Sequence, residues 1–214
     1  MEPTMADRRW KLLYLDERLI VLDKPSGLLS VPGRGPDKYD SLAVQVEADF
    51  PGARNVHRLD RDTSGVIIMA RDAETHRHLS RQFERRETDK RYIAVVAGAV
   101  AAETGRIDLP LRKDLEHPPR HRVDRQQGKP AVTDWQVVER REDSTRLALC
   151  PQTGRSHQLR VHLQAIGHPI WGDPLYADEV ALAAADRLML HAQELEVTHP
   201  SDERRIRFVA PSPF

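Results

Sequence analysis

The sequence has little of several residue types that mark whole classes of protein. One of its 214 residues is a cysteine, so no disulfide can form within the chain. Aromatic residues make up 5%, and no apolar run approaches the roughly 20 residues that cross a membrane. Residues 1–10 contain no apolar signal region. These features exclude a disulfide-stapled scaffold and a helical membrane protein, and they predict a soluble cytoplasmic protein.

Net charge is also absent. Lys plus Arg number 33 and Asp plus Glu number 33. This balance argues against binding of nucleic acid through bulk charge, although it allows a local basic groove. Basic residues gather between residues 98 and 128, which we interpret as one or two short strands with a basic loop. That loop either contacts phosphate or is a plain linker.

The apolar runs predict an α+β fold with a mostly antiparallel sheet. The runs at 10–15 and 19–22 predict a hairpin, and those at 132–138 and 147–150 predict an antiparallel pair. Cys150 ends the last run and is expected to be a buried thiol. Several strands follow one another too closely for the crossovers that parallel strands need. The predicted helices follow capping Asp or Ser residues and span 41–49, 72–87, 157–166 and 178–186.

One stretch, residues 55–70, joins a polar turn to a buried strand. Charged groups held just before a rigid strand are a common support for a reactive side chain, although Asp and Ser are also ordinary turn formers. Asp60, in this turn, has the chemistry of a base, a metal ligand or a nucleophile. We expect no metal, because no further His or Cys with ligand spacing accompanies His57 and Asp60. Asp62 is expected to hold the loop backbone rather than to act as a second acid.

These residues resemble the signature loop of the RluA-type pseudouridine synthases, through His57-Arg58-Leu59-Asp60 and the Asp-Thr-Ser-Gly that follows at 62–65. Further segments agree with the family in order and kind. They are Asp-Lys-Pro-Ser-Gly at 23–27, Lys-Arg-Tyr-Ile-Ala at 90–94, Thr-Gly-Arg-Ser-His-Gln-Leu-Arg-Val-His at 153–162, Leu-His-Ala at 190–192 and Phe-Val-Ala-Pro at 208–211. The resemblance therefore covers nearly the whole chain.

The resemblance implies the same class, with a mixed, mostly antiparallel sheet in two halves and a central active-site cleft. It implies an enzyme that detaches uracil from its ribose, turns it and rejoins it through carbon 5, with no cofactor and no metal. Asp60 is the expected nucleophile, attacking either the ribose carbon or the uracil ring. Arg160 is its expected cationic partner. Tyr92 is expected to stack on the flipped uracil; the alternative is a core aromatic in a strand, and the two roles are compatible.

Substrate contacts are expected from two segments. His57 and Arg58 flank the nucleophile, and Arg58 is expected to fill the space that the flipped uridine leaves. Arg155, His157 and Gln158, at a predicted helix start, suit contacts to phosphate.

Two residues of the same helix are interpreted differently. Arg160 lies off the apolar stripe, which would leave it free to reach across the cleft, although a solvated arginine is the alternative. His162 lies on the stripe and is expected to pack.

The motif at 24–27 lies almost at the start of the chain, which leaves no room for the separate N-terminal S4 RNA-binding domain that several relatives carry. Residues 1–214 are therefore expected to form a single catalytic domain and a monomer. Residues 27–34 most resemble the short dual-specificity members, which act on a hairpin of 23S rRNA and on the tRNA anticodon loop. The expected partner is an RNA stem-loop recognised by shape. A single-target enzyme, a non-catalytic RNA-binding or ribosome-assembly protein, and a nucleosidase that releases uracil are the alternatives.

Overall fold

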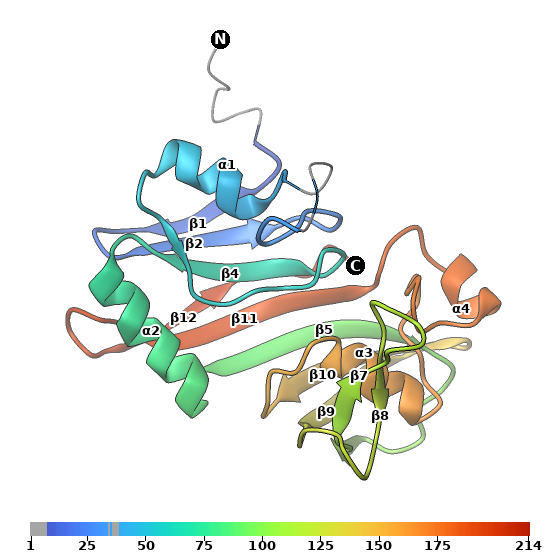
Figure 1. The fold of residues 1–214 in the computed structure, drawn as a ribbon. Helices are drawn as coiled ribbons and strands as arrows, with labels where there is room; N and C mark the ends of the chain where they lie inside the picture. Colours follow the sequence, from blue (N-terminus) through green and yellow to red (C-terminus); the bar gives the residue numbers. More distant parts are fainter. Residues whose placement is uncertain (1–7, 34, 36–38) are drawn as a thin grey trace. The chain divides into compact units, whose positions relative to one another are not determined.

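The computed structural model describes residues 8–33, 35 and 39–214. The chain forms two compact units, the first from Met1–Lys90 with Ala192–Pro213 and the second from Arg91–His191 with Phe214. Strands β5 (Asp89–Ala97) and β11 (Leu190–Thr198) contribute residues to both units. Each unit has its own share of the sheet (Figure 1). Each also has its own apolar core.

The sheet of the first unit has the strand order β1-β2-β4-β11, with β3 paired to β4 and β12 paired to β11. The predicted hairpin is formed by β1 and β2, and β2 continues the sheet antiparallel to β4. All seven residues of β4 are buried, so the polar loop before it leads into a rigid strand. The bounds of these strands are β1 Lys11–Leu15, β2 Leu19–Lys24, β3 Arg54–Asn55, β4 Ser64–Ala70 and β12 Arg205–Val209.

The register of β2 on β4 places the motif at 24–27 beside the polar loop. Leu19 lies opposite Ala70 and Lys24 lies opposite Gly65. The end of β2 is therefore next to the start of β4, where the polar loop ends. The segment that follows β2 and the loop that precedes β4 lie together at this edge of the sheet.

Two helices belong to the first unit, α1 (Leu42–Asp49) and α2 (Ala73–Arg85). Asp72 caps α2 as predicted, because its Oδ1 accepts a hydrogen bond from the Thr75 N–H at 2.8 Å. Leu79 is fully buried, and Phe83 packs partly buried against the same apolar cluster of β2 and β4. The spacing of these two residues predicted this face of the helix.

The second unit has the strand order β5-β10-β9-β6, with every pair antiparallel, and a separate two-stranded sheet of β7 and β8. Leu159 and Leu163 of α3 pack against β5 and β10 to form its core. The bounds are β6 Thr104–Asp108, β7 Leu111–Lys113, β8 His121–Val123, β9 Val132–Arg140, β10 Ser144–Pro151, α3 Gln158–Ala165 and α4 Glu179–Ala183.

The predicted α+β class with a large, mostly antiparallel sheet is confirmed. Two local predictions were wrong. Cys150 is exposed, because it follows the buried Leu149 on β10 and successive strand residues point to opposite faces. Helix α3 begins at Gln158, and its N-cap is His157 in place of Ser156, because His157 has a left-handed backbone with φ 55°.

Other expectations are tested in part or not at all. Among the helices of the described ranges, none has the length and apolar character that a membrane span requires. The central cleft expected between two halves stays a prediction. Residues 1–7 of the N-terminal stretch, and residue 34 of the segment at 27–34, lie outside the described residues.

A substitution at Gly65 tests the packing of the first unit. Gly65 has φ 113°, and a Cβ built on it would lie 2.1 Å from the carbonyl oxygen of Ala192 on β11. Gly65→Ala should therefore lower the free energy of unfolding by about 3 kcal/mol or more, measured by chemical denaturation. Gly27→Ala is the matched control, because Gly27 has φ 83° but nothing within 4 Å of a built Cβ. An equal loss at the two positions would contradict the close approach of β4 and β11.

Candidate active site

The main chain is fixed on both sides of Asp60, the predicted nucleophile. Leu59, the residue before it, is buried and exchanges two hydrogen bonds with Ser30. The Ser30 Oγ donates to the Leu59 carbonyl at 2.7 Å and accepts from the Leu59 N–H at 3.1 Å. The Thr63 N–H donates to the Asp60 carbonyl at 3.2 Å and closes the turn. The half-buried Asp60 side chain therefore extends from an ordered backbone.

The two residues after Asp60 are held by the segment that follows β2. The Gly27 N–H donates to the Arg61 carbonyl at 2.9 Å, and the Ser26 Oγ donates to the Asp62 carbonyl at 2.7 Å. Every main-chain carbonyl from Leu59 to Asp62 thus accepts a hydrogen bond. Residues 24–30 form a polar template for the loop that carries Asp60.

Lys24 is the strongest part of this template. Its side chain is fully buried, and its Nζ donates to the carbonyls of Pro25 at 2.9 Å, Leu28 at 2.7 Å and Arg61 at 2.9 Å. These bonds match the three donors of an ammonium group. This role of Lys24 was not predicted from the sequence, because lysine is rarely fully buried. Its place in the Asp-Lys-Pro-Ser-Gly motif was the available signal.

His57, which was predicted to bind substrate, supports the loop from its other end. Its Nε2 accepts a hydrogen bond from the Ile68 N–H at 3.1 Å, and its ring stacks on Phe83 with 4.5 Å between centroids. Burial, together with the charge of Lys90, lowers the pKa of His57 to about 3. The imidazole is therefore neutral, with its proton on Nδ1. We assign His57 to loop support, and a contact from Nδ1 to RNA stays a prediction.

Two arginines flank Leu59 and Asp60. Arg58 is exposed, as its predicted action on RNA requires. The Arg61 Nε donates to the Asp62 carboxylate at 2.9 Å near the surface. The Asp62 carboxylate therefore accepts from a neighbouring side chain, where a bond to the loop backbone was expected.

Arg160 of α3 is bound within the second unit. Its Nε donates to Asp173 Oδ2 at 2.8 Å and its Nη2 donates to Asp173 Oδ1 at 2.6 Å. The two side chains are 2% and 0% exposed. Arg160 is therefore held within its own unit, because this side of the helix faces a buried carboxylate. The two bonds use two of the five guanidinium N–H donors, and the pair with Asp60 stays a prediction.

Tyr176 connects Arg160 with the start of α3. The Arg160 guanidinium lies 5.1 Å from the centre of the Tyr176 ring, a distance suited to a cation–π contact. The Tyr176 hydroxyl bonds to Nδ1 of His157 at 2.7 Å and accepts from the His121 N–H at 2.8 Å. Nδ1 of His157 therefore bonds within the second unit. The phosphate contact predicted for His157 stays a prediction, and Nε2 is the ring atom that would make it.

Gln158 has a structural role in place of the predicted phosphate contact. Its Oε1 accepts hydrogen bonds from the Thr153 hydroxyl at 2.7 Å and the Arg155 N–H at 3.0 Å. Its Nε2 donates to the Val132 carbonyl at 2.9 Å and the Thr133 hydroxyl at 3.0 Å. These bonds use both donors and both lone pairs of the amide. Gln158 therefore ties the start of α3 to β9.

Tyr92 and His162 both pack in the second unit. Tyr92 lies on β5 opposite Leu149 and contacts the apolar core, while its stacking on uracil stays a prediction. His162 is fully buried, with Nδ1 2.9 Å from the Thr133 hydroxyl and Nε2 3.0 Å from the Leu109 carbonyl. Burial lowers the pKa of His162. The predicted packing role of His162 is confirmed.

Possible metal ligands gather away from these residues. In the described part of the chain, one group of three, Asp114, Glu116 and His117, brings its ligand atoms within 4.8 Å of one another. This group lies in a surface turn after β7, and Asp60 and His57 are not part of it. The expected absence of a metal from the reaction stays a prediction.

Comparisons with known proteins decide the family. The family pattern described as RNA pseudouridylate synthase matches residues 18–165. The dual-specificity RNA pseudouridine synthase RluA of Yersinia pestis is 51% identical over 204 residues, which are 95% of this chain and 99% of that protein. Its namesake in Escherichia coli strain K12 is 48% identical, over 95% of this chain and 93% of that protein. The chain belongs to the RNA pseudouridylate synthase family.

Solved structures agree with this assignment. Human RNA Pseudouridylate Synthase Domain Containing 1 superposes with a TM-score of 0.83 at 29% identity, covering 100% of this chain and 87% of that one. Human RNA Pseudouridylate Synthase Domain Containing 4 superposes with a TM-score of 0.76 at 27% identity, covering 94% of this chain and 88% of that one. The matched region 18–165 includes the loop of Asp60, the strand of Tyr92 and the helix of Arg160. The predicted enzyme class, an RNA pseudouridine synthase, is confirmed.

The lowered pKa of His57 predicts how the stability of this synthase depends on pH. In the unfolded chain His57 takes up a proton near pH 6.5, whereas in the folded protein it stays neutral until about pH 3. Stability from this group is therefore present above pH 6.5 and is lost as the pH falls from about 6.5 to about 3. His57→Gln keeps an amide oxygen that can accept from the Ile68 N–H but removes the titrating group. The melting temperature of this variant should therefore fall less than that of the wild type as the pH drops from about 6.5 to about 3. Parallel profiles for wild type and variant would contradict the buried neutral state.

The buried pair of Arg160 and Asp173 predicts a large loss when one partner changes. Asp173→Asn leaves a buried guanidinium without its carboxylate and should lower the free energy of unfolding by about 3 kcal/mol. The control is Asp134→Asn, since Asp134 binds the exposed Arg106 with the same two-bond geometry at 2.6 and 3.0 Å. That change should cost about 1 kcal/mol or less. Denaturant titrations that gave both variants the same small loss would show that the Arg160 pair is not buried in solution.

Proposed function

We propose that this RNA pseudouridine synthase isomerises uridines in two kinds of stem-loop, a hairpin of 23S rRNA and the anticodon loop of tRNA. The observation that carries the proposal is the fixed main chain around Asp60, which residues 24–30 bind on both sides. The naming of the 51% and 48% identical relatives as dual-specificity synthases supports the two substrate classes.

Asp60 acts as the nucleophile. The bond between ribose C1′ and uracil N1 breaks, the uracil turns, and a bond forms between C1′ and C5. N1 gains a proton and C5 loses one, so the reaction balances without a co-reactant. The Asp60 carboxylate attacks either C1′ or the uracil ring, and in both routes it must be ionised when the substrate is bound. A fixed backbone favours attack because it holds the carboxylate in one place.

The second unit supplies the groups expected around the uracil. Arg160 is the cationic partner that keeps a desolvated Asp60 carboxylate ionised. Asp173 fixes the plane of that guanidinium through two hydrogen bonds, so Arg160 presents its remaining N–H donors in a constant direction. Tyr92 stacks on the uracil ring. Exclusion of water keeps the detached base from ending as a hydrolysis product.

The uridine must leave its stack before it can react. Extrusion of a base costs a few kcal/mol in an ordered loop and less where the base is already unstacked. Arg58 is exposed at the start of the nucleophile loop, and its guanidinium occupies the space that the uridine leaves. Recognition by shape suits an enzyme with two stem-loop substrates, because RNA specificity resides mostly in loops.

A product assay on two RNAs tests this function. Wild-type protein, Asp60→Asn and the control Asp62→Asn are each mixed with a 23S rRNA hairpin and with a tRNA anticodon stem-loop, and pseudouridine and free uracil are quantified. The wild type should form pseudouridine in both RNAs. Asp60→Asn should lose about three orders of magnitude or more in rate, while Asp62→Asn should stay within a few-fold of wild type.

Each alternative function gives a different result in the same assay. Free uracil would indicate a nucleosidase, and RNA binding without any product would indicate a non-catalytic RNA-binding protein. Pseudouridine in one RNA alone would indicate a single-target enzyme. An active Asp60→Asn variant would show that the nucleophile is another group.

A further inference from the structure

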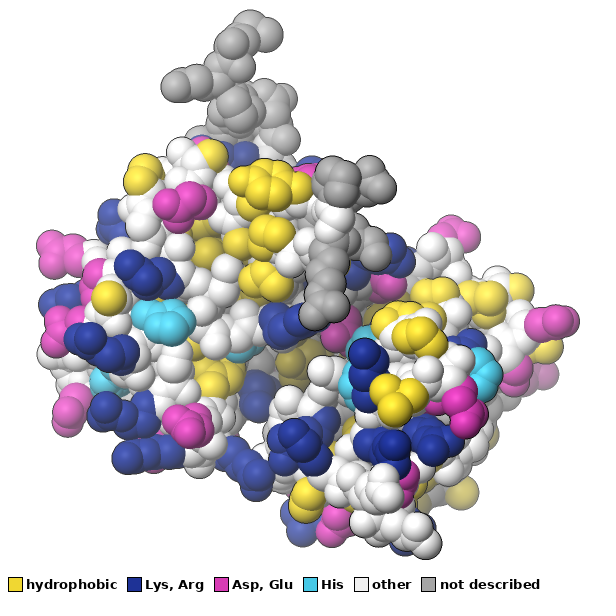
Figure 2. Space-filling view, viewed as in Figure 1, with side chains coloured by type: hydrophobic (Ala, Val, Ile, Leu, Met, Phe, Trp, Pro, Cys, Tyr) yellow, Lys and Arg dark blue, Asp and Glu magenta, His cyan; other side chains and the backbone are white. Residues whose placement is uncertain are grey.

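A cavity of about 400 Å³ opens in the second unit between the β7–β8 sheet and the turn before α3. Pockets of this volume commonly hold small ligands or parts of larger ones. Four cationic side chains line it: Arg112 and Lys113 of β7, Lys129, and Arg155. Figure 2 shows Lys and Arg side chains gathered over the part of the surface where Figure 1 places β7 and β8.

The charge of this cavity is not cancelled by its own walls. None of its lining residues is acidic. Asp124 holds Arg112 through an ion pair of 3.1 Å, and Asp114 accepts from the Glu116 N–H at 3.1 Å. Across the described residues, Lys113 and Lys129 form no ion pair.

The cationic side chains of this cavity extend from an ordered main chain. The Lys129 N–H donates to the Leu111 carbonyl at 2.8 Å, and the Leu111 N–H donates to the Lys129 carbonyl at 2.9 Å. Leu111 is itself buried in a small apolar cluster with Tyr176. Gly128, before Lys129, packs so closely that a Cβ would lie 2.3 Å from the Asp124 carbonyl oxygen. The main chain at this wall of the cavity is therefore fixed by hydrogen bonds and close packing.

Arg155 lines the cavity and is also one of the residues predicted to contact the substrate. Its Nε donates to the Pro130 carbonyl at 3.1 Å, which directs the side chain toward the segment of Lys129. Ser156, the next residue, adds a hydroxyl to the wall. Guanidinium, ammonium and hydroxyl groups are the usual protein donors to phosphate oxygens.

We propose that this cavity binds a phosphodiester group of the RNA substrate, outside the target uridine. The inference rests on the proposed function, since RNA is the polyanion that the enzyme must hold. In a chain without net charge, a local cluster of cations with no acid in the cavity wall supplies affinity for the phosphate backbone. Lys113 and Lys129 become RNA-binding residues, together with the predicted contact Arg155.

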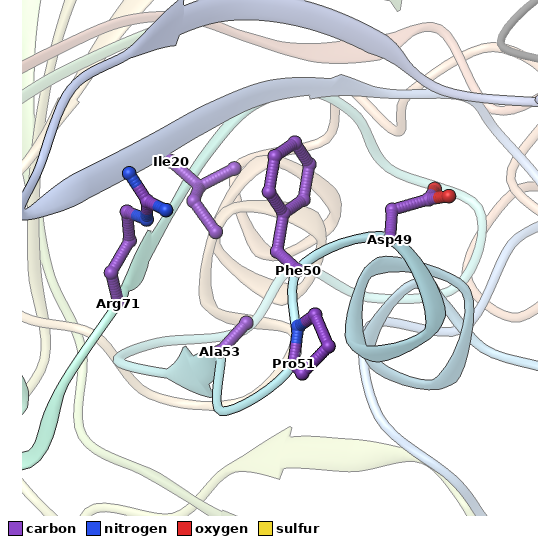
Figure 3. A pocket seen from close by; sticks show the side chains of 6 residues that line it. All are labelled: Ile20, Asp49, Phe50, Pro51, Ala53 and Arg71. Atoms are coloured by element: carbon purple, nitrogen blue, oxygen red, sulfur yellow. The ribbon is translucent and has the colours of Figure 1, made fainter.

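A smaller cavity of the first unit lacks these features. It measures about 140 Å³, and Figure 3 shows Asp49 and Arg71 on either side of Phe50. Asp49 is paired with Arg8, and the Arg71 Nη1 donates to the Asp16 carbonyl at 2.6 Å. Both charged groups are thus engaged within the fold, and the cavity has no excess of one sign.

Salt-dependent binding tests the proposal with a matched control. Lys113→Ala/Lys129→Ala removes two cavity cations, and Arg122→Ala/Arg125→Ala removes two exposed arginines of the same region that do not line the cavity. Fluorescence anisotropy gives the affinity of each full-length protein for the anticodon stem-loop at several salt concentrations. The lysine variant should bind about tenfold more weakly, and its slope of log K against log salt should fall by about 0.7, the value for the loss of one phosphate contact. The arginine variant should bind and react as wild type does.

Neutral phosphate analogues identify the contact directly. A methylphosphonate is placed at one linkage of the stem-loop at a time. At one linkage it should weaken binding by the wild type and the arginine variant while leaving the lysine variant unaffected. Uridine monophosphate, added as a competitor, should not displace the RNA at concentrations near the Kd of the RNA.

Three results would overturn the proposal. Equal losses in the lysine and arginine variants would show a bulk effect of charge. Wild-type affinity in the lysine variant would show that the cavity holds no phosphate, and displacement by uridine monophosphate would show a site for free nucleotides. Melting temperatures within about 2 °C establish that the variants are folded. Because binding and product formation are measured separately, a wild type that binds RNA without forming pseudouridine would contradict the proposed function and leave the cavity result intact.

Discussion

The hydrogen bonds between residues 24–30 and the loop of Asp60 are the constraint on which the proposed site depends. Apolar packing is non-directional and would set the position of this loop loosely. Hydrogen bonds to successive carbonyls fix the orientation of each peptide plane as well. Lys24 does most of this, because one buried ammonium group joins the turn at Pro25 and Leu28 to the carbonyl of Arg61. An unpaired ammonium in a buried place would be very costly, so the three acceptors and the lysine require one another.

The second unit uses a buried charge in a comparable way. Asp173 accepts two hydrogen bonds from Arg160, and its Oδ1 also accepts from the backbone N–H groups of Leu175 and Tyr176 at 2.9 and 3.2 Å. Orientation of the guanidinium and shape of the following turn therefore depend on the same carboxylate. Such a pair adds little net stability compared with apolar side chains of similar size. Its value here is geometric, because it fixes the direction of an arginine that is proposed to face a reactive carboxylate.

The sequence predicted what local patterns determine and missed what distant partners determine. The spacing of Leu79 and Phe83 identified the buried face of α2, and the β1–β2 hairpin follows from two apolar runs and a short polar turn. Lys24 could not be identified as a buried residue, because its partner Arg61 lies 37 positions away. Arg160 was expected to be free for the same reason, since Asp173, 13 residues on, lies beyond the end of α3. The phosphate contact was predicted for Gln158 because its four partners, Thr153, Arg155, Val132 and Thr133, could not be identified from the sequence.

Net charge gave a weak guide to RNA binding because it counts charges without their partners. Many surface arginines are neutralised by adjacent acids, as in the pairs of Arg106 with Asp134 and Arg140 with Glu103. Each such pair contributes almost nothing to the field beyond a Debye length of about 10 Å. The cavity beside β7 differs because Lys113 and Lys129 have no acid among the residues that line it. A neutral chain can therefore hold a polyanion at one place while its paired surface charges attract it little elsewhere. This arrangement suits an enzyme that must position one uridine and then release the RNA.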